Sequence, residues 1–94
     1  MNYIEFDIGG KLRGFKFGLG FLGDVLAHLD VDIVDFGKML LSNPFRTTPA
    51  ILFFGNKSHC QRKALPFDID ISDIEDWIED MESGVSNPNI VSAI

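Results

Sequence analysis

Residues 3–17 read YIEFDIGGKLRGFKF, and this stretch decides how the fold begins. Apolar and polar side chains alternate on both sides of Gly9-Gly10, with Leu12 out of phase, which is the period of a half-buried β-strand. The two glycines accept the positive φ angles of a tight hairpin turn. The sequence therefore predicts a β-hairpin over residues 3–17, in which Glu5 and Asp7 oppose Lys and Arg side chains across the strands. An isolated hairpin is marginal in water, so its apolar face must pack on other elements.

After the hairpin the apolar period changes from two residues to that of an α-helix. The spacing predicts four helices, at about residues 19–29, 32–42, 48–62 and 73–82. Asp32 suits the N-cap of the second helix, and Thr48-Pro49 suits the start of the third. Ser72 and Glu75 have the spacing of a capping box at the start of the fourth.

These elements predict one α+β domain over residues 1–82, mainly α, with the N-terminal hairpin packed on three to four short helices. A chain of 94 residues fits one small domain. Residues 83–94 contain Ser, Asn and Pro and predict a flexible C-terminal tail. The predicted core consists of Ile4, Phe6, Phe15, Phe17, Phe21, Leu22, Val25, Leu26, Phe36, Leu40, Ile51, Leu52, Ile74, Trp77 and Ile78.

The formal net charge is −6, which argues against nucleic acid as a partner because phosphate binding needs a basic surface. The charge is unevenly placed. Residues 1–63 contain all eight Lys and Arg and have a net charge of +2, whereas residues 64–94 contain eight acids and no Lys or Arg. The acidic character therefore belongs to the last third of the chain, and the rest is almost balanced.

Other sequence features predict a protein of the cytosol. No apolar run approaches the roughly 18–20 residues of a membrane span. The start of the sequence has no basic patch followed by an apolar core, as a signal peptide would have. Cys60 is the single cysteine, so no intrachain disulfide can form.

Three patterns are candidates for chemistry, and each has a plainer explanation. Residues 18–23 fit G-x-G-x-x-G, but the strand before them belongs to a hairpin and no second parallel strand follows, so a glycine-rich corner with closely approaching backbones is favoured. Residues 68–79 have the spacing of a calcium loop, but the predicted fourth helix occupies most of them. His59 and Cys60 are adjacent, so their side chains diverge on a helix, and His28 has no orienting third group. The sequence therefore predicts no catalytic, cofactor or metal site, and no enzymatic activity.

Large apolar groups remain as candidate contacts for a protein partner. We select four of them as candidate contacts, namely Phe53, Phe54, Trp77 and Ile78. Most aromatic residues of this kind supply core area instead. The chain contains nine Phe, a high number that favours the alternative of an exposed patch for a partner protein.

The order of elements resembles that of the small tail assembly chaperones of long-tailed bacteriophages and prophages. The resemblance lies in KFGLG at 16–20, ILFF at 51–54 and ISDIEDWI at 71–78, and it covers roughly residues 3–81. It implies a non-enzymatic protein of the bacterial host cytosol, one that binds and solubilises the tape measure protein before the tail tube assembles. Self-association is also implied. It also implies a longer form made by ribosomal frameshifting. The family pattern can be placed only on Trp77 and the capping box.

A different class of function fits the acidic last third. A small acidic adaptor for proteins, or an inhibitor that mimics the charge of DNA, would use such a surface. The acids are predicted on one short helix, which is a short face for a DNA mimic.

Overall fold

The predicted hairpin is present in the computed structural model, which describes residues 3–81. Strand β1 (Tyr3–Ile8) pairs antiparallel with β2 (Lys11–Lys16). Gly9 and Gly10 form the turn between them with φ angles of 65° and 84°, a region that glycine adopts without strain.

The register of the hairpin differs from the predicted charge pairing. Glu5 lies opposite Gly14, and Asp7 lies opposite Leu12. The Lys and Arg side chains of β2 instead lie opposite Tyr3, Phe6 and Ile8. Direct cross-strand pairing of the two acids with basic residues was therefore the wrong expectation, because a two-residue turn places the acids opposite Gly14 and Leu12.

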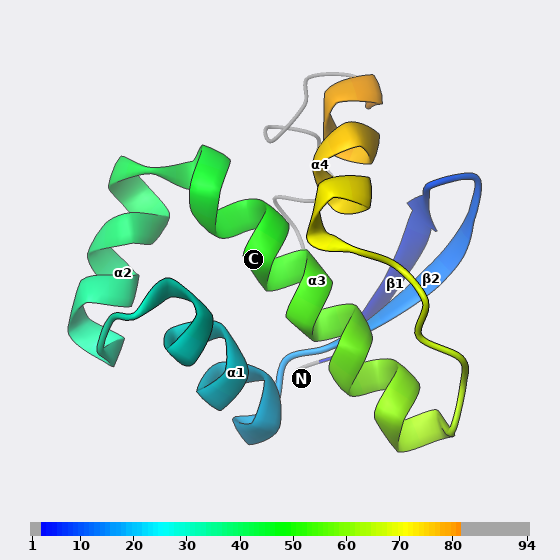
Figure 1. The fold of residues 1–94 in the computed structure, drawn as a ribbon, viewed down its shortest axis with the longest axis horizontal. Helices are drawn as coiled ribbons and strands as arrows, with labels where there is room; N and C mark the ends of the chain where they lie inside the picture. The colour runs from blue at the N-terminus through cyan, green and yellow to red at the C-terminus, as the bar shows by residue number, and fades with distance from the viewer. Residues whose placement is uncertain (1–2, 82–94) are drawn as a thin grey trace.

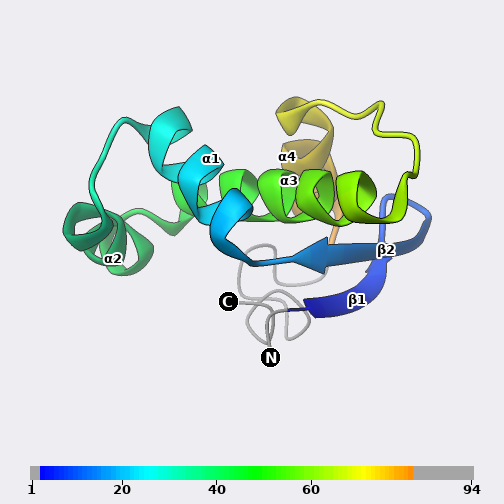
Figure 2. The ribbon, with the colours of Figure 1, turned by 90° about the horizontal axis from the view of Figure 1, so that it is seen from below.

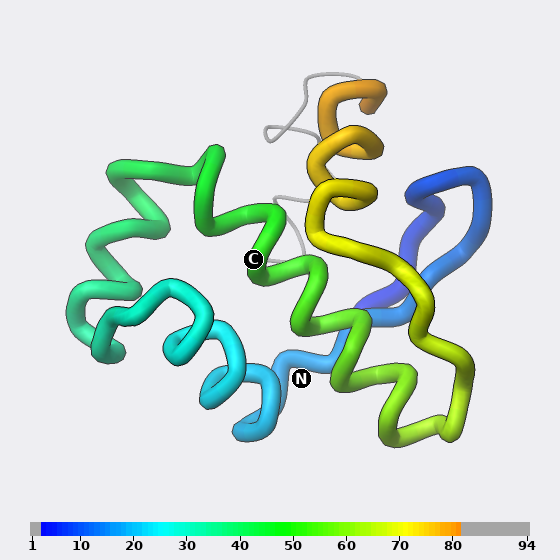
Figure 3. The backbone as a smooth tube through the Cα atoms, in the orientation of Figure 1, coloured from blue at the N-terminus to red at the C-terminus, as the bar shows by residue number. Residues whose placement is uncertain are grey.

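Four helices follow the hairpin, so the fold is α+β and mainly α, as predicted (Figure 1). They are α1 (Leu19–Leu29), α2 (Ile33–Ser42), α3 (Pro44–Lys63) and α4 (Ile71–Asp80). Helix α3 crosses the middle of the molecule, with α1 and α2 on one side and the hairpin and α4 on the other (Figures 1 and 3). Seen from below, β2 runs alongside α3 (Figure 2). The predicted tail over residues 83–94 lies outside the described residues.

The start of α2 agrees with the prediction. The Asp32 side chain accepts a hydrogen bond from the Asp35 backbone N–H at 2.8 Å, as an N-cap does. Val31, just before the cap, packs in the same cluster as Phe36, which is the pairing of a hydrophobic staple.

Helix α3 begins at Pro44, four residues before the predicted start at Thr48. Asn43 has non-helical angles (φ −144°, ψ 65°) and is both the C-cap of α2 and the N-cap of α3. Pro44 then takes the first helical position, where a missing N–H costs nothing. Pro49, expected at the first turn, lies inside the helix, and its missing donor falls opposite the carbonyl of the exposed Phe45.

Helix α4 begins at Ile71, so its cap is two residues earlier than the predicted pair Ser72 and Glu75. Asp70 and Asp73 form the capping box, in which the Asp70 backbone N–H donates to the Asp73 carboxylate at 2.9 Å. Aspartate serves as well as serine at an N-cap, and the earlier start moves the box with it.

The buried residues form two clusters, one on each side of α3. The hairpin core consists of Phe6, Ile8, Phe15, Leu52, Ile74 and Ile78. The α1–α2 core consists of Phe21, Val25, Leu29, Phe36, Ala50, Ile51 and Phe54. Phe17 and Phe53 are partly buried and pack against both cores. Helix α3 therefore contributes to both.

Nine of the fifteen predicted core residues are buried. The other six are half-buried and pack against one or both cores, namely Ile4, Phe17, Leu22, Leu26, Leu40 and Trp77. Ile8, Leu29 and Phe54 are buried although the predicted core omitted them. Within residues 3–81, no helix has both the length and the apolar character needed to cross a membrane.

Candidate functional site

The glycine-rich stretch at residues 18–23 forms the corner between β2 and α1. The only sheet that the described residues contain is the two-stranded hairpin, so the parallel βαβ unit of a dinucleotide fold is not formed there. A Cβ built on Gly20 or Gly23 would meet nothing within 4 Å. The expected close approach of backbones is therefore wrong for these two glycines. Side chains, and not backbones, come close to three other glycines, namely Gly9, Gly14 and Gly55.

The calcium-loop spacing at residues 68–79 is used to start a helix. Residues 71–80 are helical, and the Asp73 carboxylate accepts the capping hydrogen bond from Asp70. A helix cannot also wrap around an ion as a calcium loop does. Within residues 3–81 no group of three or more His, Cys, Asp or Glu is arranged to hold a metal ion.

The His and Cys side chains are not arranged as a nucleophile and a base. His28 contacts Phe54 with ring centroids 5.3 Å apart, and His59 contacts Tyr3 at 5.3 Å. Cys60 is buried, and its Sγ lies 3.8 Å from Asn56 Oδ1. Burial raises the pKa of the Cys60 thiol, so it stays protonated at neutral pH. Cys60 therefore acts as a small buried apolar group.

The raised pKa of Cys60 makes stability depend on pH in a defined direction. The unfolded thiol ionises near its ordinary pKa, about 8.5, while the folded thiol does not. The free energy of unfolding is therefore expected to fall as the pH rises through about 9. Urea unfolding at pH 7 and pH 9.5 measures the fall, and Cys60→Ala should show a smaller one. An equal fall in both proteins would contradict the prediction.

The four selected contact residues have different surroundings in the structure. Phe54 and Ile78 are buried, one in each core, and are 9% and 5% exposed. Phe53 is half-buried and packs edge-on against Phe54 and Phe67. Trp77 is half-buried under the Arg13 guanidinium, whose carbon lies 4.3 Å from the ring centroid. The structure thus places Phe54 and Ile78 away from the surface, and a partner role for Phe53 and Trp77 stays a prediction.

The structure exposes another set of large apolar side chains, which the sequence analysis did not select. Ile33, Val34, Leu41 and Phe45 lie on α2 and the first turn of α3, and we call them the α2–α3 surface. Leu41 is 89% exposed and Phe45 is 75% exposed. Val34 and Leu41 are seven residues apart and so share one helix face. The available signal was that the apolar residues of α2 cover more than one face, while only Phe36 is buried.

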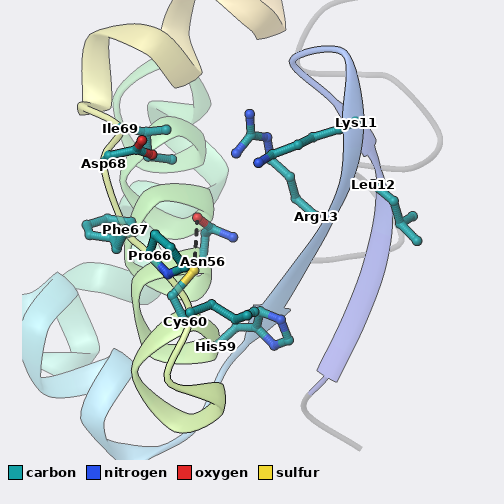
Figure 4. Close-up of a pocket in the computed structure, with 11 residues that line it drawn as sticks. Lys11, Leu12, Arg13, Asn56, His59, Cys60, Pro66, Phe67, Asp68 and Ile69 are labelled. Atoms are coloured by element: carbon teal, nitrogen blue, oxygen red, sulfur yellow. Dashed lines mark hydrogen bonds between the residues drawn. The ribbon is translucent and has the colours of Figure 1, made fainter.

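A second feature is a cavity of about 330 Å³ between the hairpin, α3 and the loop before α4 (Figure 4). Lys11 and Arg13 extend from β2 toward the loop residues Asp68 and Ile69 on the other wall (Figure 4). Asn56 joins α3 to the hairpin, because its Nδ2 donates to the Gly14 carbonyl at 2.9 Å. The cavity therefore has a basic wall and a mixed wall.

The described residues thus offer two surfaces of different character, one apolar on α2 and α3 and one basic beside the hairpin. Comparison of the chain with protein-family models, with curated proteins and with solved structures found no match.

Proposed function

We propose that this chain is a tail assembly chaperone, which binds and solubilises apolar helical segments of a phage tape measure protein in the bacterial cytoplasm without catalysing a reaction. The observation that supports the proposal most is the exposed α2–α3 surface. Large apolar side chains that stay exposed in a folded domain are typical of a binding site for another protein. The resemblance at residues 16–20, 51–54 and 71–78 points to the same function.

The α2–α3 surface has the chemistry that an apolar helix requires. A helix docks in such a site through side chains at i, i+3, i+4 and i+7, and the partner must offer apolar groups over a similar length. Val34 and Leu41 span about 10 Å along α2 at 1.5 Å per residue, which matches two turns of a bound helix. Phe45 extends this surface onto α3, where it borders a small cavity that it shares with Ile78.

The charges around this surface favour solubility of the complex. Helix α4 has exposed acids at Glu75, Asp76, Glu79 and Asp80. Two of them, Glu75 and Glu79, line the same cavity as Phe45. An apolar binding surface bordered by charge keeps a chaperone and its client in solution.

Co-expression with an apolar helical segment of a tape measure protein tests the proposal. We expect a soluble complex that elutes as one species in size-exclusion chromatography. The variant Leu41→Ser/Phe45→Ser should weaken binding at least about tenfold, because two exposed apolar anchors are lost. The fold should persist, since neither side chain is buried.

Leu19→Ser is the control, because Leu19 on α1 is as exposed as Leu41, at 89%, and lies outside the α2–α3 surface. This variant should keep its affinity for the segment. An insoluble segment with no co-eluting complex would contradict the proposed function. An equal loss of affinity in Leu19→Ser and in Leu41→Ser/Phe45→Ser would show that the α2–α3 surface is not the binding site.

The exposed acids of α4 favour a second candidate, an acidic inhibitor that mimics DNA. The ten residues of α4 span about 15 Å, which is short compared with the DNA face that a basic protein covers. Inhibition of a basic DNA-binding enzyme at low salt, lost at high salt, would support this alternative.

A further inference from the structure

Five of the eight Lys and Arg of the chain gather around His59. One cavity, of about 330 Å³, is lined by Lys11, Arg13 and His59. A second, of about 410 Å³, is lined by Lys16, His59, Arg62 and Lys63. Because His59 lines both cavities, they are neighbours, and we call their combined lining the basic surface.

The packing of β2 on α3 explains why these residues converge. A Cβ on Gly14 would lie 2.7 Å from the His59 ring, so the missing side chain lets the ring rest directly on the strand. The Asn56 side chain donates to the Gly14 carbonyl at 2.9 Å and holds the same point of the strand. Lys11 and Arg13 then lie on one side of His59, and the last turn of α3 lies on the other.

Most of the Lys and Arg residues of this surface make no ion pair within the described part of the chain. Lys11, Arg13, Arg62 and Lys63 make no ion pair with any residue in 3–81, whereas Lys57, outside the surface, lies 3.9 Å from Asp24. Arg13 is held in place, because its Nε donates to the Ile8 carbonyl at 2.9 Å and its guanidinium covers Trp77. Positive charge is thus concentrated on a protein whose net charge is −6.

The wall opposite Lys11 and Arg13 is mostly apolar. The loop before α4 contributes Leu65, Pro66, Phe67 and Ile69 to the first cavity, together with one acid, Asp68. A ligand that fills this space must therefore present negative charge to one wall and an apolar group to the other. Peptides with alternating acidic and apolar side chains meet this requirement, whereas a phosphate backbone supplies charge alone.

The size and the total charge also favour a peptide over nucleic acid. A cavity of about 330 Å³ accommodates a few side chains of an extended segment. The acids of α4 would repel a long polyanion that extends beyond the basic surface. A short acidic peptide segment avoids this repulsion.

We propose that the basic surface around His59 binds an acidic peptide segment of another protein. Its carboxylates face Lys11, Arg13, Arg62 and Lys63, and an apolar side chain occupies the space beside Leu65 and Phe67. This surface is separate in residues from the α2–α3 surface. The protein would therefore hold two partners, or two parts of one partner, at once.

Fluorescence anisotropy with a labelled peptide, Glu-Leu-Glu-Glu-Leu-Glu, tests the proposal on the full chain. We expect saturable binding that weakens as salt is raised from 50 to 300 mM, as charge pairing requires. Lys11→Gln/Lys63→Gln should weaken it about tenfold, because two exposed positive charges are removed from the surface. Lys38→Gln/Arg46→Gln removes the same charge from exposed positions on α2 and α3 and should change it less than about twofold.

Three outcomes would overturn the proposal. Equal loss in both double variants would show a response to net charge and no defined site. Equal binding of the Gln-Leu-Gln-Gln-Leu-Gln peptide would show that the carboxylates of the acidic peptide are not needed for binding. Tighter binding of oligothymidylate of the same length would assign the surface to nucleic acid. None of these outcomes depends on the tape measure segment, so the two proposals fail separately.

Discussion

Replacing Phe15 by alanine is expected to lower the free energy of unfolding by about 4 kcal/mol, within the range for a large buried aromatic side chain. Phe15 is 0% exposed and lies at the centre of the hairpin core. Its ring stacks on Phe6 at 5.0 Å and on Phe17 at 6.5 Å between centroids. A domain of this size has a total stability of roughly 5–14 kcal/mol, so the variant should lose a large part of its stability.

Urea unfolding followed by the fluorescence of Trp77 measures this effect, because Trp77 packs against the same core. Phe45→Ala is the matched control, since it removes the same group from a side chain that is 75% exposed. The control should change the free energy of unfolding by less than about 0.5 kcal/mol. A loss below about 1.5 kcal/mol for Phe15→Ala would mean that the hairpin does not depend on this core.

Gly55→Ala is expected to destabilise the protein by about 2 kcal/mol, although the same change usually stabilises a helix interior. Gly55 lies in the middle of α3, and a Cβ there would come within 2.5 Å of the Phe17 ring and 3.4 Å of the Phe15 Cβ. Phe17 directly follows β2 and packs on Phe15 and Phe21, so its ring has little freedom to move away. Alanine would therefore force α3 and β2 apart.

Gly37→Ala is the control for the helix effect. Gly37 lies in α2, and a Cβ there would meet nothing within 4 Å. This variant should gain up to about 1 kcal/mol from the lower backbone entropy of the unfolded chain. Thermal unfolding of both variants shows whether each change raises or lowers the stability. Stabilisation by Gly55→Ala would contradict the close packing of α3 on β2.

The parts of the fold that the sequence predicts are those in which the local signal and the packing agree. The alternation over residues 3–17 predicts the hairpin because its apolar face is the buried one, with Phe6 and Ile8 in the core. The stripe on α1 and the Asp32 cap predict their helices for the same reason. At these positions no competing local pattern is present.

The misplaced helix starts come from competing signals of similar strength. Thr48-Pro49 and Asn43-Pro44 both fit a helix start, and the structure uses the earlier one because the helix continues through Pro49. Ser72 and Asp70 both suit an N-cap, and the structure uses the aspartate. Local preferences of less than about 1 kcal/mol cannot separate such pairs when tertiary packing decides.

The candidate surfaces were harder to predict than the fold, since the sequence does not show which apolar residues stay exposed. Phe45 and Phe54 look alike in the sequence, yet one is 75% exposed and the other 9%. The basic surface also depends on tertiary structure, because Lys11 in β2 and Lys63 in α3 are more than fifty residues apart in the sequence. The negative total charge hid this cluster, and the near balance of charge over residues 1–63 did not indicate it.

The placement of α3 between two cores has a consequence for the order of events during synthesis. All buried members of the α1–α2 core come from residues 21–54, so this core can assemble as soon as α3 has left the ribosome. The hairpin core also needs Ile74 and Ile78, which are made last among the core residues. Until then the apolar face of the hairpin has no complete cover, although the hairpin is translated before the four helices. Helix α4 therefore ends the interval in which the nascent chain is most prone to aggregate.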